Sequence, residues 1–165
     1  MSDAINSSPK SGQAKIMKIS REALPISKSV SVGKSLMSTR MKIANEVAKT
    51  RRAWRAYNSS RRRNAVYEFL TAVAAVVDCW KKERRLRDSV NLTRNLHQGS
   101  VRIWTDDPFL TIIDCAAKQT DAKARSKWAT ALRFAAANRD ENESIENFMR
   151  RKGGINECAA QYSKM

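Results

Sequence analysis

The chain has 165 residues, is 42% hydrophobic and carries a formal net charge of +16 at pH 7. This length suits one domain with a tail, and the hydrophobic fraction is ample for a core. No stretch approaches the roughly 18–20 apolar residues of a membrane span, and the start lacks the apolar region of a signal peptide, so we expect a soluble cytoplasmic protein. Five glycines and three prolines leave few turns, which favours helices over sheet.

Three cysteines and one histidine argue against two kinds of site. Cys79, Cys115 and Cys158 are widely spaced among apolar residues, which is typical of free thiols and not of a disulfide framework or a zinc site. His97 has no neighbouring cysteine or serine for a catalytic pair. Because we find no catalytic constellation, we predict that the protein is not an enzyme and holds no cofactor or metal.

Residues 1–38 contain ten serines and scattered lysines but little apolar surface, which predicts a disordered basic arm. A serine-rich start with few acidic residues is also typical of a transit peptide or a secretion signal, and this alternative stays open. Gly33-Lys34-Ser35 matches only the end of a phosphate-binding loop, because Lys28 stands where that motif requires glycine.

Two amphipathic helices follow the arm. The first is predicted over 39–57, with Ile43, Val47 and Trp54 on one apolar face. Residues 58–60 break this helix and offer a cap for a second one over 61–85. In the second helix apolar residues recur at spacings of three and four, which predicts a helix at the centre of a bundle.

The rest of the chain also reads as helical. Leu86 to Leu96 either continues the second helix or follows a break near residues 88–89, and Val101 to Trp104 reads as an extended connector with the character of an edge strand. Three capping residues predict further helix starts: Asp107 before Pro108, Asp121, and Ser144. We therefore predict an all-α compact bundle of about five to six helices over 39–165, ending in a helical hairpin over 144–163.

Charge is concentrated between Arg40 and Arg94, where fifteen basic residues accompany five acidic ones. A surplus this dense usually has an anionic partner, most often nucleic acid. One cluster lies around the 58–60 bend and another follows Trp80. The predicted contact residues are Arg51, Arg52, Arg55, Arg61, Arg62, Arg63, Lys81, Lys82, Arg84, Arg85 and Arg87. The arginine triplet at the start of the second helix opposes the helix dipole, which suits a phosphate site.

Four aromatic residues lie among these arginines, as stacked nucleic-acid bases would require: Trp54, Tyr57, Tyr67 and Trp80. Their helical phase places Trp54 and Trp80 on the apolar faces. Core packing is therefore the favoured interpretation for these two, whereas Tyr67 falls beside the apolar stripe.

The stretch 148–160 combines an apolar helix with basic residues, Gly153-Gly154, and a helix with paired alanines. It resembles the first half of a Fis-type helix-turn-helix, whose recognition helix would follow, although only residues 161–165 remain. A hairpin that closes the bundle and a dimerisation hairpin are the alternatives. Over residues 40–162 the blocks 53–67, 107–129 and 148–159 resemble a group of small uncharacterised bacterial proteins, which implies a helical fold and a bacterial cytoplasmic setting.

We predict sequence-tolerant nucleic-acid binding, with DNA as the favoured partner and phosphate contacts dominant. A regulator, a nucleoid-associated protein or a mobile-element accessory protein would bind in this way. The alternative is a non-enzymatic adaptor whose basic face docks an acidic protein, with a homodimer formed through the C-terminal hairpin. A membrane-surface role is disfavoured, because the apolar face near Trp80 is needed for the core.

Overall fold

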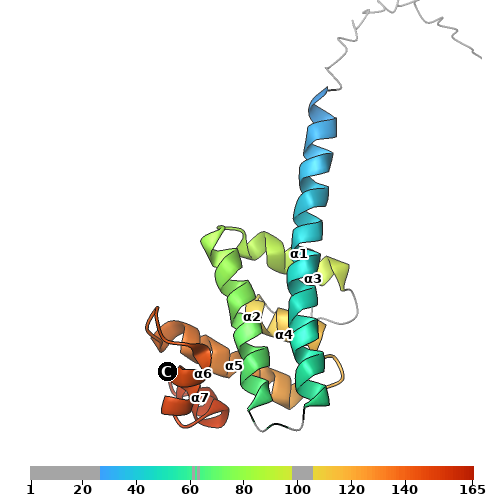
Figure 1. Ribbon diagram of the computed structural model, residues 1–165. Helices are drawn as coiled ribbons and strands as arrows, with labels where there is room; N and C mark the ends of the chain where they lie inside the picture. The colour runs from blue at the N-terminus through green and yellow to red at the C-terminus, as the bar shows by residue number, and fades with distance from the viewer. Residues whose placement is uncertain (1–26, 61, 63, 98–105) are drawn as a thin grey trace, which may run out of the picture.

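Figure 1 shows the computed structural model, which describes residues 27–60, 62, 64–97 and 106–165, with side chains described from Met37 onward. These residues form seven helices and no strand, so the predicted all-α fold is confirmed, with more helices than the five to six expected. The helices are α1 (Ser27–Ser59), α2 (Ala65–Lys82), α3 (Leu86–Leu96), α4 (Pro108–Ala116), α5 (Ala122–Asn138), α6 (Ile145–Arg151) and α7 (Ile155–Tyr162). Residues 1–26 of the predicted arm and the connector at 101–104 lie outside the described residues.

α1 and α2 lie side by side and antiparallel (Figure 1). α1 begins at Ser27, whereas the sequence predicted a helix from Thr39 and an arm before it. Among the described side chains of α1, Ile43 is the first that is buried. The helix extends beyond the rest of the fold before this point (Figure 1), and the serines and lysines of this stretch had indicated an arm.

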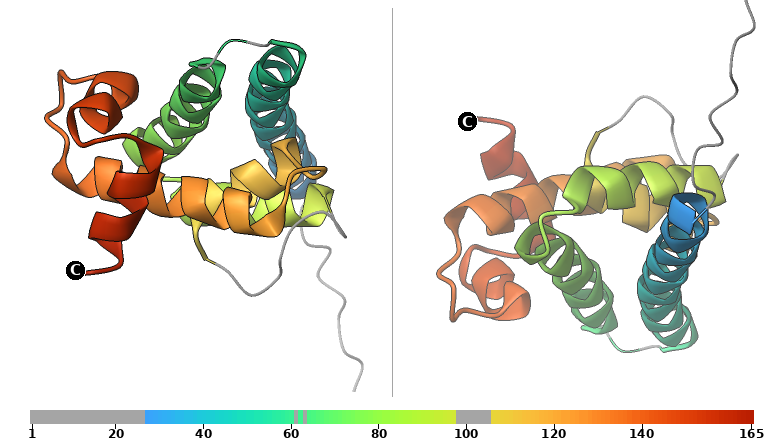
Figure 2. Two further views of the ribbon diagram at one scale, coloured as in Figure 1. Left: turned by 90° about the horizontal axis from the view of Figure 1, so that it is seen from below. Right: turned by 90° about the horizontal axis from the view of Figure 1, so that it is seen from above.

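α3, α4 and α5 form a second layer across the α1–α2 pair, and α6 and α7 lie at one end of that layer (Figure 2). α2 supplies a wide buried stripe that includes Phe69, Val73 and Trp80, as predicted for a central helix. Across the two layers the largest fully buried side chains are Trp80, Phe69, Phe148, Ile43, Leu70, Ile112, Ile113, Leu132 and Met149.

The turn after α2 has Arg84 in the left-handed region, with φ 52°. The Arg84 N–H donates to the Lys81 carbonyl and the Arg85 N–H to the Trp80 carbonyl, both at 3.0 Å. This pair of bonds is a Schellman motif, whose left-handed position usually holds glycine because a side chain is strained there. The break between α2 and α3 therefore lies at Arg84, earlier than the sequence suggested.

Three predicted helix starts are confirmed by their caps. An Asp107 carboxylate oxygen accepts from the Phe109 N–H at 3.0 Å, and Ser144 Oγ accepts from the Asn147 N–H at 3.1 Å. Asp121 accepts from two backbone N–H groups at the start of α5. Each side chain satisfies N–H groups that have no partner within the helix.

α6 and α7 occupy the segment 144–163, over which the sequence predicted a C-terminal hairpin. Gly153 and Gly154 join them at φ 92° and 95°, values that glycine adopts readily. Their N–H groups donate to the carbonyls of Arg150 and Met149 in the same Schellman pattern that follows α2. α7 packs along α5 with Cys158 fully buried, so the hairpin closes one end of the bundle.

Candidate nucleic-acid interface

The two predicted basic clusters lie at opposite ends of the α1–α2 pair (Figure 1). We call residues 49–68, around the α1–α2 connection, the bend end. We call residues 78–88, around the α2–α3 turn, together with Lys42 and Glu46 of α1, the corner end. The 18 residues of α2 separate the two ends by about 27 Å at ~1.5 Å per residue. The clusters therefore do not form one continuous surface.

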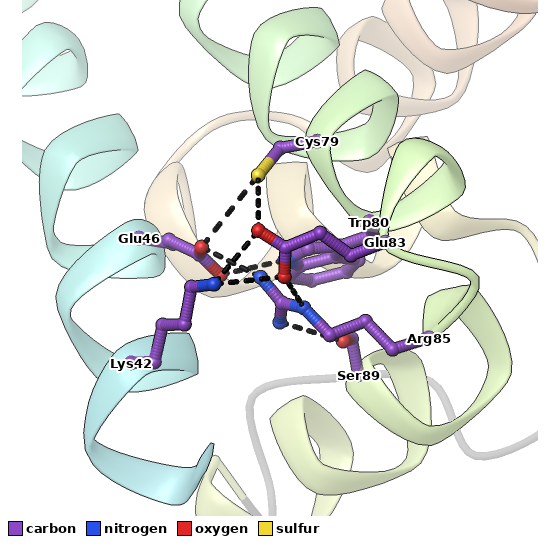
Figure 3. A network of polar contacts seen from close by, with 7 residues as sticks. All are labelled: Lys42, Glu46, Cys79, Trp80, Glu83, Arg85 and Ser89. Carbon is purple, nitrogen blue, oxygen red and sulfur yellow. Dashed lines mark hydrogen bonds and ion pairs between the residues drawn. The ribbon is translucent and has the colours of Figure 1, made fainter. Parts of the chain in front are cut away.

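At the corner end, a network of ion pairs and hydrogen bonds connects α1 to the end of α2 and the turn that follows it (Figure 3). Arg85 Nη2 lies 2.7 Å from Glu46 Oε1, and the Trp80 indole N–H donates to Glu46 Oε2 at 2.7 Å. Arg85 also donates to Glu83, which accepts from Lys42 Nζ at 2.7 Å. The Arg85 and Glu46 side chains are only 14% and 11% exposed, so this guanidinium is held inside the fold and does not face a ligand.

Protonation states at the corner end follow from these contacts. The hydrogen bonds from Lys42 and then from Arg85 lower the pKa of Glu83 to about 2, so this carboxylate stays ionised. Burial, followed by the hydrogen bond to Glu83 and the charges of Glu83 and Glu46, raises the pKa of the Cys79 thiol. The network fixes α1 to the α2–α3 turn, which is a structural role.

The other basic residues of the corner end stand among acidic ones. Lys81 and Lys82 line a hollow of about 470 Å³ together with Asp78, Arg139 and Glu141. Asp78 pairs with Arg139 at 2.8 Å. The exposed predicted contact residues at this end are Lys81, Lys82, Arg84 and Arg87. With six basic and four acidic residues, the corner end carries a net charge of only +2.

At the bend end, one predicted contact residue points inward. Arg51 Nε donates to the Cys115 carbonyl at 3.3 Å, near the C-terminus of α4, and Arg51 Nη2 lies 3.0 Å from His97 Nδ1. Burial, and then the charge of Arg51, lowers the pKa of His97. Arg51 therefore joins α1 to α3 and α4, and its guanidinium does not belong to the exposed cluster.

The outward-facing arginines of the bend end are Arg52, Arg55 and Arg62, all of them exposed. Arg52 and Arg55 are three residues apart on α1 and so share a face. None of the three makes an ion pair within the described part of the chain. Because α2 begins at Ala65, Arg62 lies in the connection and not within the helix as predicted. The two other arginines of that triplet, residues 61 and 63, lie outside the described residues.

Three lysines that were not predicted lie in the α4–α5 turn and in α5, next to residues that line a cleft shared with the bend end. Lys118, Lys123 and Lys127 are exposed, and none makes an ion pair with the residues that the structure describes. Sequence reasoning missed them because residues 95–165 hold eleven basic and nine acidic residues, so this segment shows almost no charge surplus. Several of those acidic side chains are engaged elsewhere, such as Asp114, which lies 2.7 Å from Arg125. The four-residue spacing of Lys123 and Lys127 was a usable signal, since it places them on one helix face.

A cleft of about 680 Å³ lies between these groups, bordered by the bend, the α4–α5 turn and the start of α5. It is lined by Trp54, Tyr57, Asn58, Ser60, Arg62, Val66, Gln119, Thr120, Ala124 and Trp128. A hollow of about 360 Å³ adjoins it, shares Ala124 and Trp128, and adds Lys127. The arrangement brings together aromatic rings and two cations, Arg62 and Lys127, that make no ion pair with described residues.

The aromatic residues divide between core and cleft. Trp80 is fully buried, as predicted. Trp54 packs against the core and also lines the cleft, with its ring centroid 5.1 Å from that of Tyr57 and 5.9 Å from that of Trp128. Tyr67 lies beside the core, where the Arg150 guanidinium sits 5.0 Å from its ring centroid. The sequence favoured core packing for Trp54, whereas in the structure its ring both packs against the core and lines the cleft.

No family model, curated protein or solved structure matches the chain. Within the described residues, no cluster of three or more His, Cys, Asp or Glu side chains is arranged to hold a metal ion. Nor does the described part contain a helix with the length and apolar character needed to span a membrane. A functional assignment therefore depends on the charge and shape of the bend end.

Proposed function

We propose that the protein binds nucleic acid through the bend end, mainly by contacts to the phosphate backbone. The observation that carries this proposal is the difference in net charge between the two ends, +6 at the bend end and +2 at the corner end. At the bend end, Arg52, Arg55 and Arg62 are exposed, make no ion pair with described residues and have one acidic neighbour, Glu68. At the corner end, carboxylates engage Arg85 and Lys42, and the four other cations, which make no ion pair with described residues, share that end with four acidic residues. Exposed cations without partners are those that a phosphate backbone recruits.

Six side chains supply the proposed contact surface: Arg52, Arg55, Arg62, Lys118, Lys123 and Lys127. The arginines offer forked donors that bind phosphate oxygens in pairs, and the lysines act as point charges. Contacts of this kind go to the phosphate backbone, which carries no direct sequence information, so the proposed binding is sequence-tolerant. We favour DNA as the partner, which fits a regulator or a nucleoid-associated protein.

A salt titration tests the proposal. The affinity for duplex DNA, single-stranded DNA and RNA is measured by fluorescence anisotropy at several salt concentrations. Contacts from six cations predict a slope of log affinity against log salt of about −5 for duplex DNA and about −4 for a single strand. Binding that does not respond to salt, or an absence of binding to all three nucleic acids, overturns the proposal. If poly-glutamate binds while nucleic acid does not, the adaptor function is supported instead.

A further inference from the structure

The cleft at the bend end exposes parts of aromatic rings that a simple core would cover completely. Trp54 and Tyr57 are half-buried, although Trp54 contacts the rings of Tyr57, Phe69 and Trp128. Tyr57 and Trp128 also lie close, with ring centroids 6.2 Å apart. The cleft therefore has an aromatic wall that is backed by the core and held in place by it.

Polar groups that have no partner among the described residues line the same cleft. The side-chain amides of Asn58 and Gln119 make no hydrogen bond within the described part of the chain. Each amide offers both donors and an acceptor. Arg62, also without an ion-pair partner among the described residues, lies on the cleft lining, so a positive charge stands beside the aromatic wall.

These three features match the chemistry of one nucleotide in a strand. An aromatic wall stacks on the face of a base, and it does so with any base because every base has a π-face. Amide side chains bind the edge of a base through donor and acceptor groups. A guanidinium binds the phosphate that follows. The cleft volume of about 680 Å³ falls within the range of small-ligand sites.

We propose that this cleft holds an unpaired nucleobase, so that the protein prefers single-stranded nucleic acid to duplex. The inference rests on the proposed function and names its substrate class. A base in a duplex is already stacked and paired, and removing it costs free energy that an unpaired base does not require. The cations around the cleft attract either form, whereas the aromatic wall discriminates between them.

A strand without bases separates stacking from charge. An oligothymidylate of about twelve nucleotides is compared with an abasic strand of the same length and phosphate count. We expect the abasic strand to bind at least about fivefold more weakly at the same salt concentration. Equal affinity for the two strands overturns the cleft proposal and leaves phosphate binding intact. If neither strand binds in a salt-dependent way, the proposed function itself fails.

A matched pair of variants locates the effect. Ala124→Leu places a larger side chain in the cleft without a change of charge, and Ala136→Leu makes the same change at an exposed position of α5. We expect Ala124→Leu to remove most of the preference for thymidylate over the abasic strand, while the affinity for the abasic strand is kept. Ala136→Leu is expected to keep both affinities. If the two variants behave alike, with circular dichroism showing that both are folded, the base does not bind in this cleft.

Discussion

The bend end and the corner end of the α1–α2 pair have similar runs of arginine and lysine but different surroundings. At the corner end, Glu46 and Glu83 bind Arg85 and Lys42, and six basic residues accompany four acidic ones. At the bend end, seven basic residues accompany one acidic residue, Glu68. The corner end uses Arg85 and Lys42 to hold helices together and is close to neutral, whereas the bend end carries a net charge of +6 and exposes Arg52, Arg55 and Arg62.

This difference shows why the density of charge in a sequence is a poor guide to a binding surface. Arg85 and Arg55 look alike in the chain, yet Arg85 is held by two carboxylates while Arg55 is exposed and makes no ion pair among the described residues. A buried ion pair involves a desolvation penalty that only close partners offset. An exposed cation has no such requirement, because water solvates its charge.

The largest expected effect is the loss of stability when Arg85 is removed. Arg85→Ala leaves the Glu46 carboxylate without its cation in a largely desolvated position, so we expect a loss of about 2–4 kcal/mol in the free energy of unfolding. Urea unfolding measures this loss. Arg55→Ala, the matched change at the bend end, is expected to stay within about 0.5 kcal/mol of the wild type. A similar loss from both variants would remove the distinction between the two ends.

A smaller gain is expected at Arg84, the corner-end arginine with a left-handed backbone. Because glycine adopts φ near 52° without strain, Arg84→Gly is expected to raise the free energy of unfolding by about 0.5–1 kcal/mol. Arg55→Gly, within α1, is expected to lower it by about 1 kcal/mol. Thermal unfolding of the two variants measures these opposite changes in stability. An unstable Arg84→Gly variant would mean that the arginine side chain makes a contact of structural importance.

The smallest expected effect concerns His97, which contacts the inward-facing Arg51. The pKa of His97 in the folded protein lies below its ordinary value of 6.5, so the unfolded chain takes up the proton first as the pH falls. The stability that neutral His97 contributes is therefore fully present above pH 6.5, and it is lost as the pH falls below 6.5 toward the pKa of the folded protein. Between about pH 7.5 and 5.5, we expect the free energy of unfolding to fall less in His97→Gln than in the wild type, as urea unfolding at each pH would measure. An unchanged pH dependence would show that His97 does not contribute.

Local sequence signals predicted much of the fold. Asp107, Asp121 and Ser144 each supply a side-chain oxygen at a helix start, and such capping depends only on neighbouring residues. The apolar stripe of α2 identified the central helix for the same reason. The first turns of α1 were missed because residues 27–38 are rich in serine and lysine, a composition that indicated an arm.

The site was harder to predict, because it depends on which side chains meet. Nothing in the sequence shows that Glu46 reaches Arg85, 39 residues away, or that Arg51 turns toward the end of α4. The lysines of the α4–α5 region were hidden for the same reason, since their acidic neighbours in sequence are engaged elsewhere. The bend cluster itself was visible in the sequence as a local charge surplus, and its role in binding stays a prediction.

The most direct test of the bend-end proposal compares two triple variants that remove the same charge. One is Arg52→Ala/Arg55→Ala/Arg62→Ala at the bend end, and the other is Lys81→Ala/Lys82→Ala/Arg87→Ala at the corner end. Both lower the net charge by three, so a difference between them reports position. We expect the bend-end variant to make the salt slope less steep by about 3 and the corner-end variant to leave it almost unchanged. Equal changes in slope, or a larger change from the corner-end variant, would contradict the assignment of binding to the bend end.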